Sequence, residues 1–364
     1  MVRLILLGLL SGAFFSSTFV LNELMSSAGG HWFWSASLRY AFMLLLLTVM
    51  IGAQHGVGRI KALWAIFCQH WRFWCVTGSI GFGVFYTGIC YAADHVSGWV
   101  VAATFMFTVV SSLLVLLAFG QRFDKKFVFY ALLVFAGVLL ANISEGLHSS
   151  DNHGAGLSAL LLYGALPALV AAFSYPIGNQ LVWQASFNAK KKQEQQALLA
   201  QAALDMHETP PSERTYAERT HDTHAIDTPA AGILSAWIAR IPVIDTQLLT
   251  DAFNKVWLMT LGSFPFWIVL GLVVRPELPQ SSQVINTFLV ALLSGVAATS
   301  IFLYAREHAT TSSEVAGVDA TQTSEIIFAL IGGMLLLGSP LPSALGLFGI
   351  ALIIVGLVLF AKDG

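Results

Sequence analysis

Charged residues are scarce in this chain. Only 10% of its 364 residues are Asp, Glu, Lys or Arg, whereas 56% are hydrophobic. A typical soluble domain carries about 25% charged residues, and the mean hydropathy here is +0.74. This composition excludes a soluble globular protein. We expect the lipid bilayer to surround the chain, and we expect no nucleic-acid partner.

Cysteine and the usual signatures of catalysis are also rare or missing. The three cysteines, Cys68, Cys75 and Cys90, are an odd number and outline no disulfide framework. No phosphate-binding glycine loop, nucleophile elbow or zinc-binding helix occurs. Three histidines between residues 207 and 224 have no cysteine or second ligand pair beside them. We therefore expect neither an enzyme nor a cofactor nor a metal site.

Long apolar runs, by contrast, fill most of the chain. About 20 apolar residues cross a hydrocarbon core of about 30 Å, and a helix satisfies its backbone there without water. The predicted spans are 4–22, 32–52, 73–91, 97–119, 127–143, 157–183, 252–274, 284–305, 313–337 and 342–361. An alternative makes the first span a secretory signal peptide, but its apolar run is longer than the usual signal core of roughly 7–15 residues.

The second five spans resemble the first five. Residues 12–24 align with 170–181, and YAADH at 91–95 corresponds to YAREH at 304–308. Secondary transporters are commonly built from such repeats, with the substrate site at their interface. The sequence therefore predicts an all-α polytopic membrane protein with ten transmembrane helices arranged as two inverted five-helix repeats.

Basic residues indicate the orientation, because Lys and Arg are enriched in cytoplasmic loops. Those in loops on one predicted side are Arg59, Lys61, Arg72, Arg122, Lys125, Lys126, Lys190, Lys191 and Lys192. The loops of the opposite side contain Arg275 as their one full positive charge. We expect both termini in the cytoplasm and a location in a bacterial inner membrane.

The chain divides at a polar central stretch. We assign 1–148 to the first repeat, 149–184 to the sixth helix, 185–251 to a cytoplasmic loop, and 252–364 to the remaining helices of the second repeat. Helix-forming residues at the start of the loop favour an extension of the sixth helix. A polar, proline-bounded linker is expected to follow, and then a short helix on the membrane surface.

Ionisable residues inside a span are costly and mark function. The ninth span contains Asp319, Gln322 and Glu325, which spread over one broad helix face. Burial near mid-span disfavours a charged carboxylate, so Glu325 could exchange a proton near neutral pH. The alternative is that the helix begins only after Glu325, but too few apolar residues would then remain to cross a membrane.

The first two spans add a second polar group. Asn22 and Glu23 lie near the end of the first span, and Arg39 lies two turns into the second. Ser11, Thr18 and Asn22 form a stripe that would either line a wet cavity or hold helices together by hydrogen bonds. Arg39 would either pair with Glu23, as a structural pair or an outer gate, or contact substrate.

Several aromatic residues near mid-span complete the candidate site. They are Phe15, Phe82, Tyr86, Phe107 and Tyr175. Asn179, which the repeat places opposite Asn22, is a further candidate. An acidic cavity with aromatic walls would suit a lipophilic cation, although any of these side chains could simply pack in the core.

Three segments resemble a known family. LRYAFMLLLL, YAADHVSGWVVAATF and SYPIGNQ are similar to the drug/metabolite transporter superfamily (EamA-like), and most of all to its ten-helix multidrug resistance efflux transporters. This resemblance implies an inner-membrane exporter of small molecules, usually in exchange for protons. The essential glutamate of the related four-helix proteins lies in the middle of their first helix, where this chain has none, and Glu23 follows two turns later.

We therefore expect export of lipophilic or cationic compounds by proton-coupled alternating access. Protons and a small-molecule substrate would be its partners. A single chain would suffice, and a homodimer would be compatible with the same mechanism. Two alternatives stay open: a metabolite exporter or facilitator for amino acids or sugars, with Arg39 holding an anionic group, and a non-transporting membrane sensor or assembly protein.

Overall fold

The computed structural model describes residues 2–119, 125–153, 157–208, 238 and 240–363. All regular elements in this part of the chain are helices, and none is a strand. Ten of its helical segments are long and apolar enough to cross a membrane, from Val2–Ser27 to Ala344–Asp363. Each overlaps one of the ten predicted spans, so the predicted all-helical membrane fold is confirmed.

Each of the first two spans is a single helix, whereas several later spans consist of two or three consecutive helical segments. The elements of the first half are α1 (Val2–Ser27), α2 (Trp32–His55), α3 (Val57–Gln69), α4 (Trp71–Gly78), η1 (Ser79–Val84), α5 (Phe85–Ala93), α6 (Gly98–Phe105), α7 (Thr108–Ala118) and α8 (Lys125–His153). Those of the second half are α9 (Leu157–Leu160), η2 (Leu161–Ala165), α10 (Leu166–Glu208), η3 (Gln247–Thr250), α13 (Ala252–Val274), α14 (Ser281–Val290), η4 (Ala291–Ala298), α15 (Thr299–Glu307), α16 (Ser312–Ala320), η5 (Thr321–Thr323), α17 (Ser324–Leu337) and α18 (Ala344–Asp363).

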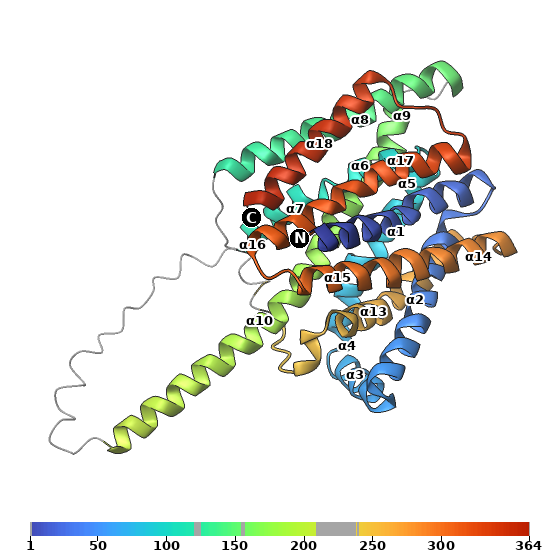
Figure 1. Ribbon diagram of the computed structural model, residues 1–364. Coiled ribbons are helices and arrows are strands. Elements are labelled where there is room, and N and C mark those ends of the chain that lie inside the picture. Colours follow the sequence, from blue (N-terminus) through green and yellow to red (C-terminus); the bar gives the residue numbers. More distant parts are fainter. Residues whose placement is uncertain (1, 120–124, 154–156, 209–237, 239, 364) are drawn as a thin grey trace.

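The start of α1 and the end of α18 lie at the same end of the bundle (Figure 1). We call this the terminal end, and the opposite one the distal end. From the terminal end, α10 projects well beyond the other helices (Figure 1) and continues to Glu208. The expected linker and most of the expected surface helix lie outside the described residues. Residues 240–251, the described part of that stretch before α13, contain the 3-10 helix η3.

Interruptions occur in several spans: the fourth is divided between α6 and α7, the sixth contains the π-helical segment η2, and the third, eighth and ninth contain others. The third and eighth spans contain the π-helical segments η1 and η4, and the ninth is broken by the 3-10 turn η5. Such segments change which side chains face a neighbouring helix, and they are frequent at functional sites. The ninth span nevertheless begins at Glu314, so Glu325 lies within it rather than before it.

The first span is packed inside the bundle rather than at its edge. α1 contacts α17 and η5 on one side, and α14, η4 and α15 on another. Small residues permit the close approach: a Cβ atom placed on Gly12 would lie 2.3 Å from the Ser324 hydroxyl. Because α1 supplies part of the core, it is an integral helix of the fold.

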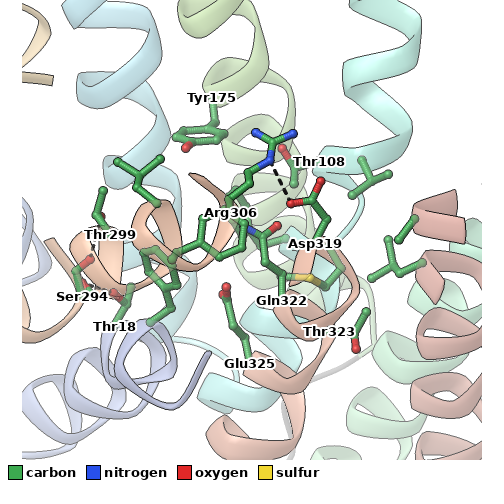
Figure 2. A pocket seen from close by; sticks show the side chains of 18 of the residues that line it. Thr18, Thr108, Tyr175, Ser294, Thr299, Arg306, Asp319, Gln322, Thr323 and Glu325 are labelled. Atoms are coloured by element: carbon green, nitrogen blue, oxygen red, sulfur yellow. Dashed lines mark hydrogen bonds and ion pairs between the residues drawn. The ribbon is translucent and has the colours of Figure 1, made fainter. Parts of the chain in front are cut away.

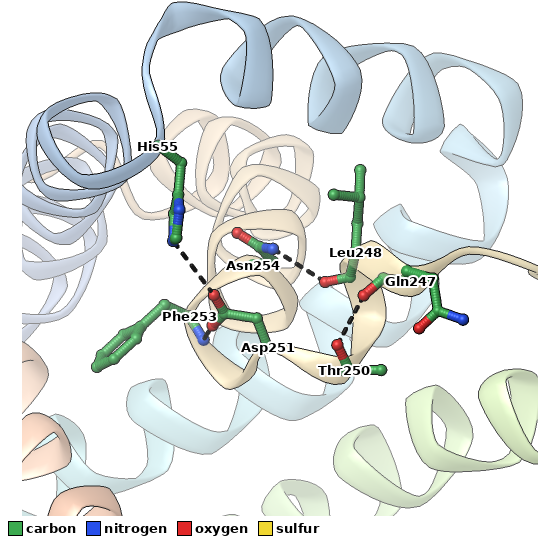
Figure 3. A network of polar contacts seen from close by, with 7 residues as sticks. All are labelled: His55, Gln247, Leu248, Thr250, Asp251, Phe253 and Asn254. Carbon is green, nitrogen blue, oxygen red and sulfur yellow. Dashed lines mark hydrogen bonds and ion pairs between the residues drawn. The ribbon is translucent and has the colours of Figure 1, made fainter.

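A polar network fixes the beginning of α13 (Figure 3). Asp251 caps the helix by accepting a hydrogen bond from the Phe253 amide at 2.8 Å, and Asn254 donates to the Leu248 carbonyl at 2.9 Å. His55, at the end of α2, lies 3.9 Å from the Asp251 carboxylate. These contacts hold the start of α13 beside α2 at the terminal end.

Candidate functional site

A cavity of about 1310 Å³ lies inside the bundle. Its walls are largely aromatic and aliphatic. The aromatic side chains along it include Phe15, Phe19, Tyr40, Phe82, Phe85, Phe105, Tyr175 and Phe302. This volume exceeds the usual range of about 300–1,000 Å³ for a small-molecule site, so a drug-sized or larger compound would fit.

The cavity reaches the terminal end of the bundle. Ala252 at the start of α13, Thr310 between α15 and α16, and Asp363 at the end of α18 all belong to its wall. The distal end is held by polar contacts instead: Glu23 accepts a hydrogen bond from the Gly98 amide at 2.7 Å, and Gln283 donates to Ser35 at 2.9 Å. The cavity thus reaches the terminal end, whereas polar contacts join the helices at the distal end.

Glu325 is the most deeply buried acid of the cavity wall. It is 8% exposed and lies at the start of α17, directly after the η5 turn. Among the described residues, its carboxylate takes part in no ion pair. Figure 2 shows its side chain among the polar groups of the cavity. A carboxylate in this position is free to bind a proton or a cation.

Asp319 and Gln322 line the same cavity nearer its mouth. Asp319 lies 3.2 Å from the Nε atom of Arg306, which extends from the end of α15 (Figure 2). Both partners of this ion pair remain substantially exposed. Asp319, Gln322 and Glu325 thus line one cavity, and Asp319 has a counter-charge in Arg306, whereas Glu325 forms no ion pair with another described residue.

Arg39 enters the cavity wall from α2 and is 8% exposed. Its guanidinium group donates to the Ser294 hydroxyl at 3.0 Å, and its Cζ atom lies 4.0 Å from the centre of the Tyr86 ring. The Nε and Nη1 atoms have no hydrogen-bond partner among the described residues. The expected pair with Glu23 is not formed, because Glu23 is bound to the Gly98 amide at the distal end.

The remaining predicted residues are divided between the cavity and the core. Tyr175 belongs to the cavity wall and interacts electrostatically with both Glu325 and Arg39. Tyr86 is fully buried beneath Arg39 and accepts a hydrogen bond from Asn22 at 3.1 Å. Tyr86, which is held by Asn22, thus helps to position Arg39 at the cavity wall.

Besides Glu23, Asn22 and Tyr86, two further predicted residues lie outside the cavity wall. Phe107 packs its ring against Phe135 and Phe173, with centroid distances of 5.9 and 5.8 Å. Asn179 lies one helical turn beyond Tyr175 on α10 and interacts with the Tyr175 hydroxyl. The sequence assigned both by repeat position and depth, and neither criterion specifies which way a side chain points.

The polar stripe of α1 mainly joins helices. Ser11 donates to the Ala298 carbonyl at 2.9 Å, and Thr18 donates to the Ser294 hydroxyl at 2.7 Å. Thr18 also belongs to the cavity wall. Thr18 therefore has both roles that the sequence left open, whereas Ser11 and Asn22 join helices.

The eighth span supplies site residues that the sequence analysis missed. Ser294, Thr299, Phe302 and Arg306 all line the cavity. Thr299, Phe302 and Arg306 are spaced by three and four residues and so share one helix face, a pattern that was readable in advance. Ser294 lies within the π-helical segment η4, and the sequence gives no sign of that segment.

Comparison with known proteins identifies the family. The family model described as "EmrE: Putative multidrug resistance efflux transporter" matches residues 2–363. The chain belongs to this family of membrane transporters. The resemblance noted in the sequence is thereby confirmed over almost the entire length.

Two relatives share this similarity. The uncharacterized protein YjlA of Bacillus subtilis (strain 168) is 28% identical over 98% of this chain and 94% of its own length. An uncharacterized 42.1 kDa protein of Shouchella clausii is 28% identical over 84% of this chain, which corresponds to 65% of that protein. Membership of the family assigns the chain to efflux transport as a multi-pass membrane protein.

Proposed function

We propose that the protein exports small molecules across the bacterial inner membrane in exchange for protons. The observation that carries this proposal is Glu325, a buried carboxylate that has no counter-charge among the described residues and lies in the wall of a large aromatic cavity. Lipophilic or cationic compounds are the expected substrates, because aromatic faces attract cations and a carboxylate neutralises them. Asp319 is a weaker candidate for coupling, since it is paired with Arg306.

In this mechanism a proton and the substrate compete for Glu325. When the cavity is open to the cytoplasm, a cationic substrate displaces the proton and takes its place beside the carboxylate. The opposite conformation releases the substrate when a new proton arrives from outside. Only one of the two occupies Glu325 at a time, so movement of one down its gradient drives the other.

Related contacts in the two halves support the inverted repeat that alternating access requires. α1 packs on η4 and α15, and α10 correspondingly packs on η1 and α5. Likewise, α1 contacts α17 of the ninth span, and α10 contacts α7 of the fourth span, which is its counterpart in the first half. Rocking of these matched groups would close the terminal end and open the distal end. One chain supplies the whole cavity wall described here, so a monomer would be sufficient.

The basic loops support a cytoplasmic terminal end. Lys61 and Arg72 lie near the junction of α3 and α4, and Lys190–Lys192 lie on the projecting part of α10. Positive residues favour the cytoplasmic side. The open cavity would then collect its substrate from the cytoplasm, as an exporter requires.

A second candidate is export or facilitated movement of a metabolite with an anionic group. Arg39 favours it, because two nitrogen atoms of its buried guanidinium group have no hydrogen-bond partner in the part of the chain that the structure describes. Amino acids and acidic sugars offer such a group.

Purified protein in proteoliposomes with an imposed pH gradient tests the proposal. Lipophilic cations, amino acids and sugars are added in turn, and a pH-sensitive dye reports proton movement. Substrate-dependent dissipation of the gradient supports antiport. No dissipation with any compound, from protein that binds at least one of them, would rule antiport out and leave a facilitator.

A further inference from the structure

Two ionisable groups of opposite sign, Arg39 and Glu325, line the cavity without forming an ion pair with each other. Arg39 and Glu325 are each 8% exposed, and both belong to the cavity wall. Neither takes part in the ion pairs formed by the described residues. Arg306 and Asp319 differ, because they contact each other near the mouth. Two buried charges of opposite sign have therefore stayed apart although a cavity connects them.

The surroundings of Arg39 leave its charge uncompensated. Its hydrogen bond goes to the neutral hydroxyl of Ser294, and the ring of Tyr86 covers one face. Ser294 in turn is held by Thr18, at 2.7 Å. A buried cation is stabilised well by an anion and poorly by neutral groups. Ser294 and Tyr86 thus fix the position of the guanidinium group, and a ligand in the cavity would have to supply its counter-anion.

Tyr175 lines the cavity near both Arg39 and Glu325. It lies within electrostatic range of each of them. Its ring packs against Phe85 and Phe105, with centroid distances of 5.1 and 6.0 Å. An apolar or aromatic wall thus separates a cationic position from an anionic one.

We infer that the preferred substrate is a zwitterion with an aromatic body, whose carboxylate binds at Arg39 and whose ammonium group binds at Glu325. This inference rests on the proposed export function and specifies its substrate class. A simple lipophilic cation would pair with Glu325, but it would leave Arg39 without an anion and would be repelled by its positive charge. A simple anion would pair with Arg39, but it would leave Glu325 without a cation and would be repelled by its negative charge. A zwitterion neutralises both groups and carries no net charge through the bilayer.

The test compares compounds that differ only in charge. One set is phenylalanine, phenylalaninamide and 3-phenylpropionate, and a longer set is phenylalanyl-phenylalanine, its C-terminal amide and its N-acetyl derivative. Binding to the full chain in lipid nanodiscs is measured by calorimetry, and proton movement is measured in proteoliposomes. In at least one set the zwitterion should bind about tenfold or more tightly than either singly charged analogue, as expected for one charge-assisted hydrogen bond gained.

Single substitutions assign each end of the ligand. Arg39→Gln should remove the preference of the zwitterion over the amide while keeping its preference over the compound without an ammonium group. Glu325→Gln should remove the preference of the zwitterion over the compound without an ammonium group while keeping its preference over the amide. Arg72→Gln serves as the matched control, since this arginine is exposed outside the cavity, and it should change neither preference. Arg39→Lys, which keeps the charge, should restore part of the preference.

The outcomes separate this inference from the proposed function. If amides bind and drive protons as well as the zwitterions do, the zwitterion assignment is overturned and proton-coupled export stands. If a zwitterion binds in an Arg39-dependent way but moves no protons, the substrate class is supported and coupling is rejected. The comparison of compounds on the unaltered chain decides the question even if Arg39→Gln does not fold.

Discussion

The Nε atom of Arg306 lies 3.2 Å from an oxygen of Asp319 and joins the end of α15 to α16 at the mouth of the cavity. Half-exposed pairs of this kind contribute roughly 0.2–1 kcal/mol. A double-mutant cycle of Arg306→Gln and Asp319→Asn should therefore give a coupling energy of at most about 1 kcal/mol in thermal unfolding. A coupling above about 2 kcal/mol would mean that water is excluded from the mouth.

The open terminal end predicts one-sided access to the cavity. In a chain whose three cysteines are replaced by alanine, Thr299→Cys should react with a membrane-impermeant maleimide from the side that bears the termini. Thr299 lines the cavity, whereas Ser35 is 4% exposed and receives a hydrogen bond from Gln283 at the distal end. Ser35→Cys should consequently react from neither side. Equal labelling of both positions would contradict a closed distal end.

Glu23 should control how often the distal end opens. Its carboxylate accepts a hydrogen bond of 2.7 Å from the Gly98 amide at the start of α6. Glu23→Gln weakens a charge-assisted bond and should shift the population towards the distally open state. A reporter at Phe19→Cys, which lines the cavity beside this contact, should then be labelled faster from the distal side.

The matched control for that experiment is Glu277→Gln. Glu277 is an exposed acid between α13 and α14 at the same end. It should leave the labelling rate of the reporter unchanged. An equal acceleration by both substitutions would assign the effect to surface charge rather than to the bond with Gly98.

The crossing of α4 and α13 should tolerate no added methyl group. A Cβ atom on Gly262 would lie 2.0 Å from the Trp74 carbonyl oxygen, whereas one on Gly58 would meet nothing within 4 Å. Gly262→Ala should therefore lower the melting temperature and the yield of folded protein, because two backbones would have to separate. Gly58→Ala, on the exposed helix α3, should be neutral or stabilising by up to about 1 kcal/mol. Similar behaviour of both variants in detergent would contradict this packing.

The sequence predicted the ten spans because hydrophobic length is a local property. It also selected Glu325 and Arg39, since a charge inside an apolar run stands out without any knowledge of the fold. Their partners could not be predicted in the same way. The contacts of Arg39 come from Ser294 on η4 and Tyr86 on α5, and Ser294 lies within a π-helical segment that has no sequence signature.

The directions of side chains were likewise beyond the reach of the sequence. Phe107 and Tyr175 were both expected near mid-span, yet Tyr175 lines the cavity and Phe107 packs on Phe173. The repeat alignment made Asn179 a counterpart of Asn22. However, Asn22 donates a hydrogen bond to Tyr86 on another helix, whereas Asn179 interacts with Tyr175 on its own helix. Depth in a span is readable from hydropathy, but the face that a residue presents depends on how the helices pack.

The most direct test of the account uses Glu325→Gln in two assays on the same proteoliposomes. Substrate counterflow measures exchange without a proton gradient, and a pH-sensitive dye measures proton movement. We predict that Glu325→Gln abolishes substrate-driven proton movement, while Glu194→Gln, an exposed acid on the projecting part of α10, behaves like the unaltered protein. Proton movement that persists in folded Glu325→Gln protein would contradict the assignment of this carboxylate as the coupling group.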